Sequence, residues 1–181
     1  RKKLAAFAAH PSLLGFWSMD EPDVWGVGPA ELVELRAILG EGTRVHPASS
    51  GIFPPSRHFM EQQESMDVVY VDPYPKKKNP DPITAVREWI DGAKRANKPI
   101  VCVVQAFEAL PAWPKPSAAE LENYVYQALV HGAIGIFYYS MNDPGWNLAQ
   151  SELWEKTKQL NGELKALAPG QGCAATLLDV P

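Results

Sequence analysis

Short apolar runs alternate with segments of helical periodicity along the chain, and this alternation restricts the fold more than any other feature. Four runs have the β-branched and aromatic content of strands buried on both faces, and they cover residues 13–19, 66–75, 99–107 and 133–141. Residues 43–51 predict a fifth, weaker strand. Helical segments cover residues 1–10, 29–42, 56–65, 81–98, 116–132 and 151–169. This order predicts an α/β protein with a parallel sheet and helices outside it.

Two architectures fit the alternation: an open doubly wound sheet and a closed eight-stranded barrel. The first strand leads into "MDEPDVWGVG", which has no G-x-G-x-x-G turn opening onto a helix, so a dinucleotide-binding sheet is disfavoured. Polar and aromatic residues instead follow the strands: Asp20, Glu21, His46, Asp72, Tyr74, Gln105, Tyr138, Tyr139 and Asn142. Barrel enzymes assemble their sites at that rim, so we expect a TIM-type barrel, present here as a partial barrel of about five strands.

The expected domain organisation follows from this interpretation. Residues 1–169 would form the C-terminal part of the barrel, and residues 170–181 a tail or the start of a following domain. Because Arg1 opens inside a helical pattern, we expect a fragment. The remaining barrel strands would come from the same longer chain or from another chain, and a signal peptide would lie upstream.

Composition limits the classes of partner. The chain has 181 residues, of which 46% are hydrophobic and 21% charged, as in an ordinary globular domain with a core. A net charge of −4 argues against nucleic acid, and the basic run Lys76–Lys78 lies between prolines as a solvated loop would. No apolar stretch approaches the ~20 residues of a membrane span. The four histidines lack metal-ligand spacing, so we expect no metal or cofactor.

Four segments, "LLGFWSMDEPD", "MDVVYVDPYP", "PIVCVVQAF" and "LVHGAIGIFYYSMND", together resemble strands four to eight of a clan A-like glycoside hydrolase barrel. The resemblance implies hydrolysis of an oligo- or polysaccharide by an extracellular or periplasmic enzyme, although the sequence itself does not fix the compartment. In that superfamily the fourth strand ends in an Asn-Glu or Asp-Glu pair followed by proline. The matching residue, Glu21, would be the general acid/base, and Asp20 would orient substrate.

The sequence departs from that family at the seventh strand, which ends in Gln105 where the family has a nucleophilic glutamate. An amide cannot serve as that nucleophile. Three alternatives stay open: Glu108 in the following loop, Asp72 at the end of the preceding strand, or the 2-acetamido group of the sugar itself, as in substrate-assisted hexosaminidases. The last would require a neighbouring tyrosine, and Tyr74 or Tyr138 could supply it.

The substrate-binding residues expected beside these carboxylates are largely aromatic, because sugars present apolar C–H faces to rings. Trp25, Trp113 and Trp146 are expected as loop platforms, and of the adjacent Phe16 and Trp17 one should pack under the helices while the other lines the interior. The full set is Asp20, Trp25, His46, Tyr74, Gln105, Trp113, Tyr138, Tyr139, Asn142 and Trp146. The main rival interpretation is a non-catalytic carbohydrate-binding barrel that has lost its nucleophile; a barrel hydrolase or aldolase ranks last, because no lysine stands at a strand end.

Overall fold

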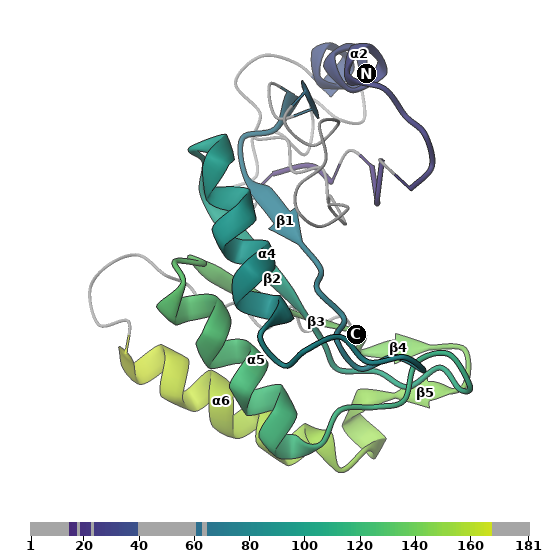
Figure 1. Ribbon diagram of the computed structural model, residues 1–181, viewed down its shortest axis with the longest axis vertical. Helices are drawn as coiled ribbons and strands as arrows, with labels where there is room; N and C mark the ends of the chain where they lie inside the picture. Colours follow the sequence, from purple (N-terminus) through teal and green to yellow (C-terminus); the bar gives the residue numbers. More distant parts are fainter. Residues whose placement is uncertain (1–14, 18, 23, 40–60, 63–64, 168–181) are drawn as a thin grey trace. The chain divides into compact units, whose positions relative to one another are not determined.

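The computed structural model describes residues 15–17, 19–22, 24–39, 61–62 and 65–167 (Figure 1). The helices are α2 (Pro29–Leu39), α4 (Ala85–Ala93), α5 (Ala118–Val130) and α6 (Leu153–Leu167), with 3-10 turns at Lys94–Ala96 and Leu148–Gln150. The strands are β1 (Val69–Val71), β2 (Ile100–Gln105), β3 (Gly135–Tyr139), β4 (Asn142–Asp143) and β5 (Trp146–Asn147). The described chain is therefore an α/β structure.

The strands form two sheets, a parallel one in the order β1-β2-β3 and an antiparallel β4-β5 pair. β1 and β2 are buried at every position, which is why their sequences are apolar without alternation. The chain divides into two compact units, which are described separately below. The first extends to Asp72 and includes Glu88–Val101; the second comprises Pro73–Arg87 and the chain from Cys102 onward.

In the first unit, β1 begins beside the start of β2, where the Val69 N–H donates to the Pro99 carbonyl at 2.8 Å. The α2 helix buries Leu32 and ends near an ion pair of 2.8 Å between Arg36 and Asp67. The Arg36 guanidinium also donates to the Ser65 carbonyl at 3.2 Å. These contacts join α2 to the segment that leads into β1, and so they help to position the start of that strand.

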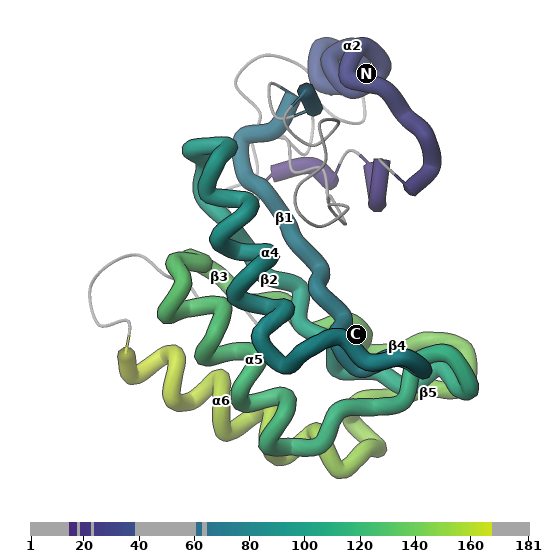
Figure 2. The backbone as a smooth tube through the Cα atoms, viewed as in Figure 1, coloured from purple at the N-terminus to yellow at the C-terminus, as the bar shows by residue number. Residues whose placement is uncertain are grey.

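In the second unit, α5 and α6 run alongside each other (Figure 1). The Lys156 ammonium lies 2.7 Å from Glu122, and the Tyr126 hydroxyl donates to Glu163 at 2.5 Å. Figure 2 follows the backbone from β3 through the β4-β5 hairpin into α6. The hairpin turns at Pro144 and Gly145; proline fixes its own φ and Gly145 has φ +82°, as a type II turn requires.

The expected partial barrel of five parallel strands is wrong. Within the described residues the parallel sheet has three strands, and the final strand leads into an antiparallel hairpin. Of the strand expected at 13–19, Phe16 forms only a single bridge, and the strand expected at 43–51 lies outside the described residues. The apolar runs do not distinguish a barrel from an open sheet, because strands covered on both faces have the same apolar sequences in both.

Candidate functional site

A buried carboxyl group follows β1 directly in the first unit. Asp72 is only 9% exposed, and its Oδ1 atom is buried with no hydrogen-bond partner among the described residues. The strand that precedes it, Val69–Val71, is buried throughout, which places the carboxyl group at the edge of an apolar interior. Buried polar atoms are normally hydrogen-bonded, so an orphaned oxygen at a strand end marks a site that a ligand group could complete.

Glu21 approaches Asp72 from a strained turn. Its φ is +41°, in the left-handed region that non-glycine residues rarely adopt, and Pro22 further disfavours a helical backbone at the residue before it. The turn is held because the Glu21 carbonyl accepts hydrogen bonds from the N–H groups of Val24 at 3.0 Å and Trp25 at 3.2 Å. Strain of this kind persists where the surrounding contacts require it, and functional sites are where it clusters.

The Glu21 carboxyl group lies close enough to Asp72 to act on its protonation. Burial raises the pKa of Asp72 to about 9, and the negative charge of Glu21 and the hydrogen bond to it contribute to the rise, with a smaller effect from the charge of Asp20. Two adjacent carboxylates cannot both ionise without repulsion, so the pair retains a proton at neutral pH. The arrangement is suited to proton transfer.

Some residues near this pair in the first unit were expected at the site from the sequence, and others were not. Asp20 is exposed, and Trp25 lies in the turn after Glu21 with 70% of its surface exposed. Trp17, four residues before Glu21, packs edge-on against Tyr70. No group of three His, Cys, Asp or Glu side chains in the described part of the chain could hold a metal ion. His46 lies outside the described residues.

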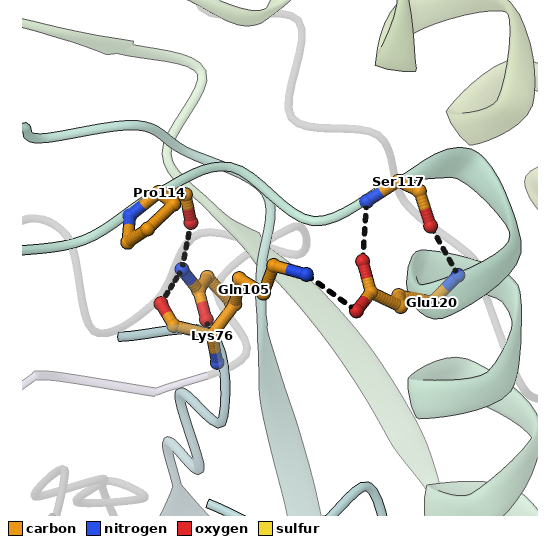
Figure 3. Close-up of polar contacts among 5 residues, drawn as sticks. All are labelled: Lys76, Gln105, Pro114, Ser117 and Glu120. Atoms are coloured by element: carbon orange, nitrogen blue, oxygen red, sulfur yellow. Dashed lines mark hydrogen bonds and ion pairs between the residues drawn. The ribbon is translucent and has the colours of Figure 1, made fainter. Parts of the chain in front are cut away.

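Gln105 occupies a structural position in the second unit (Figure 3). It is fully buried, and its amide nitrogen donates to the carbonyls of Lys76 at 2.7 Å and Pro114 at 3.1 Å. Its amide oxygen accepts from the Lys76 N–H at 2.9 Å. Only an amide side chain offers two donors and an acceptor here, which gives a physical reason for glutamine instead of glutamate. The side chain is engaged with backbone atoms and is not exposed to a substrate.

Four aromatic rings of the second unit form a cluster, which we call the ring cluster: Tyr74, Phe107, Trp113 and Tyr139. Tyr74 lies 5.3 Å from Phe107, 5.9 Å from Trp113 and 5.9 Å from Tyr139, measured between ring centroids. Tyr139, at 43% exposure, is the member most open to solvent. The structure thus joins three of the expected substrate-binding residues with Phe107, whose ring lies 5.4 Å from that of Tyr139.

Other expected site residues of the second unit lie in differing surroundings. The Tyr138 hydroxyl is buried without a partner among the described residues, and burial raises the pKa of that phenol. The Trp146 indole N–H donates to the Ser140 carbonyl at 3.1 Å, which fixes the ring to the hairpin. Asn142 is exposed at the start of β4, paired with Asn147. Glu108 follows β2 with partial exposure, and its negative charge acts on Lys115.

Sequence reasoning missed the contact between Trp17 and Tyr70, because Tyr70 was assigned only to the interior of a strand. The available signal was spacing: Tyr70 and Asp72 are two residues apart, so side chains there point to the same face of an extended chain. Spacing alone could not identify Trp17 as the ring that contacts Tyr70, since that contact joins segments about fifty residues apart in sequence.

The fold and the site define an α/β protein in which a strand end carries a pair of interacting carboxyl groups. No family model matches the sequence, and comparison with curated proteins gives no significant match. Within the described residues no helix combines the length and apolarity needed to cross a bilayer.

Proposed function

We propose that the protein is a glycoside hydrolase acting on an oligo- or polysaccharide, with the Glu21–Asp72 pair as its acid/base group. The observation that carries the proposal is the pair itself: Asp72 is buried at the end of β1 beside Glu21, and its raised pKa keeps it protonated at neutral pH. Glycoside hydrolysis needs a carboxylic acid that remains protonated beside the bond to be cleaved, because the departing sugar oxygen must receive a proton.

The two carboxyl groups would have different roles. Asp72 holds the proton of the pair, and Glu21, the less buried member, would relay that proton to the glycosidic oxygen. Cleavage of the carbon–oxygen bond then releases an alcohol, and the sugar carbon takes the hydroxyl of a water molecule, whose remaining proton returns to the pair. Negative charge left on the two carboxylates would stabilise the positive charge that develops on the sugar ring.

The proposal is tested with isosteric amides in the intact protein on a panel of chromogenic and natural glycosides. Glu21→Gln should lower kcat by about 10²–10⁴-fold, the usual contribution of a positioned acid/base group. Substrate binding measured by calorimetry should remain, since glutamine keeps the size of glutamate. Glu34→Gln, which neutralises an exposed carboxylate on α2 in the same unit, is the matched control and should leave kcat unchanged. Equal activity of Glu21→Gln and wild type would refute the assignment.

Glu108 stays a candidate nucleophile and needs its own experiment. A Glu108→Gln variant that loses activity and recovers it with added azide would assign covalent catalysis to Glu108. If this substitution has no effect, water or the 2-acetamido group of the substrate would be the attacking group, and a substrate series with and without that acetamido group would separate the two.

A second candidate function is carbohydrate binding without hydrolysis. Gln105 favours it, because the side chain at the end of β2 is held by backbone groups and supplies no nucleophile. The ring cluster would then supply the contact surface for sugar. Binding of oligosaccharides by calorimetry together with no hydrolysis across the panel would favour this function over the first.

A further inference from the structure

Trp17 is a large apolar side chain held in a half-exposed position in the first unit. Its surface is 47% exposed, and its ring contacts the buried Tyr70 ring edge-on, with centroids 4.8 Å apart and an interplanar angle of 71°. Tyr70 is only 3% exposed, so the contact anchors one side of the indole to the interior. An anchored indole loses little side-chain entropy when a ligand covers its remaining surface.

The same two segments that bring Trp17 to Tyr70 also bring Glu21 to Asp72. Trp17 precedes Glu21 by four residues, and Tyr70 precedes Asp72 by two. The two contacts occur in the same order along both segments, so the segments run in the same direction through the contact region. Because Tyr70 and Asp72 lie on one face of the extended chain, the Trp17 contact and the carboxyl pair belong to that face.

We propose that Trp17 is a substrate-positioning residue, whose exposed ring stacks on the apolar face of an uncharged pyranose and holds its glycosidic bond against the carboxyl pair. This inference rests on the proposed glycoside hydrolase function and adds the substrate class. Carbohydrate C–H faces cover aromatic rings, and a fixed ring beside the acid/base pair limits the orientation in which a sugar can bind. An acidic sugar is disfavoured because Asp20 and Glu21 contribute negative charge to the same region.

The test compares Trp17→Ala and Trp17→Phe with wild type in the intact protein. Loss of the ring should raise KM roughly five- to tenfold while kcat stays within about twofold, as expected for lost aromatic stacking. Phenylalanine keeps an aromatic face, so the KM of Trp17→Phe should lie close to that of wild type. Uncharged oligosaccharides should be hydrolysed in preference to the corresponding uronic acid oligosaccharides.

Trp154→Ala is the matched control, because it removes an indole from α6, where the ring lies below Lys158 at 5.8 Å. It should leave KM unchanged. An unchanged KM in Trp17→Ala, with wild-type hydrolysis intact, would overturn the role of Trp17 and leave the hydrolase function standing. If wild type hydrolyses no glycoside, calorimetry with the same oligosaccharides tests whether the Trp17 ring binds sugar. Weaker binding by Trp17→Ala supports stacking of a sugar on Trp17. Equal binding by the two proteins, or no binding by either, refutes it.

Discussion

Replacing Gln105 with glutamate tests whether the amide of this side chain has a structural role or a role in the chemistry of the site. The exchange changes one NH₂ group to an oxygen with almost no change in volume. In the second unit that NH₂ group donates to the carbonyl oxygens of Lys76 at 2.7 Å and Pro114 at 3.1 Å. Glutamate would place an oxygen opposite both of these acceptors in a site that is fully buried. We therefore expect a loss of stability.

The size of the loss follows from the contacts. The two carbonyl groups that face this buried side chain would lose their donor, at about 1–3 kcal/mol each, so the free energy of unfolding should fall by roughly 2–6 kcal/mol. For a chain of this size that corresponds to a fall in Tm of roughly 4–24 °C. The new carboxyl group would also bind its proton more tightly in the folded state than in the unfolded state, because burial and the two carbonyl oxygens oppose its charge. The deficit should consequently grow as the pH rises above about 4.3.

Thermal and urea unfolding, followed by circular dichroism at pH 4 and pH 7.5, would measure both effects. Gln150→Glu makes the same chemical change at an exposed position and should stay within about 0.5 kcal/mol of wild type. A Gln105→Glu protein that melts within about 1 °C of wild type at pH 7.5, or that is less stable at pH 4 than at pH 7.5 relative to wild type, would refute the reasoning.

Two further predictions concern stability. Because the folded-state pKa of Asp72 lies above its unfolded value, its contribution to the free energy of unfolding is fully present below about pH 4 and is lost as the pH rises towards 9. Asp72→Asn should flatten this decline in stability, as measured by urea unfolding. An equally steep decline in the variant would contradict the raised pKa of Asp72. Gly145 and Gly162 both have open space where a Cβ would lie, but only Gly145 has a positive φ. Gly145→Ala should therefore lower stability by about 1 kcal/mol, and Gly162→Ala in α6 should raise it by about 0.5–1 kcal/mol. If both substitutions change Tm in the same direction, φ does not decide the outcome.

Local signals in the sequence predicted the elements better than their assembly. Serine is a typical N-cap residue, and the hydroxyl of Ser117, just before α5, accepts from the Glu120 N–H at 3.2 Å while Glu120 accepts from the Ser117 N–H at 2.7 Å. A capping box is encoded within four residues, so sequence alone finds it. The β4-β5 hairpin was missed because its strands are two residues long and too short to show a period, although Pro144-Gly145 is a turn signal.

The same distinction applies to the candidate site: some of its residues could be predicted from the sequence, but not all of their contacts. Glu21 and Asp72 could be named because each follows an apolar run, and the structure brings them close enough to interact. The structural use of Gln105 could not be foreseen, since its partners are backbone groups of Lys76 and Pro114 in other loops. The barrel was wrong because an apolar run records that a strand is covered on both faces but not how many strands accompany it.

The left-handed backbone at Glu21 has a consequence for how this sequence can change over evolutionary time. Glycine and asparagine adopt that conformation at lower cost, by roughly 1 kcal/mol or more, so selection for stability alone would favour them at position 21. Retention of glutamate there would require purifying selection for its carboxyl group. A lineage released from that selection should drift first to glycine or asparagine at this position, gaining stability as it loses acidity.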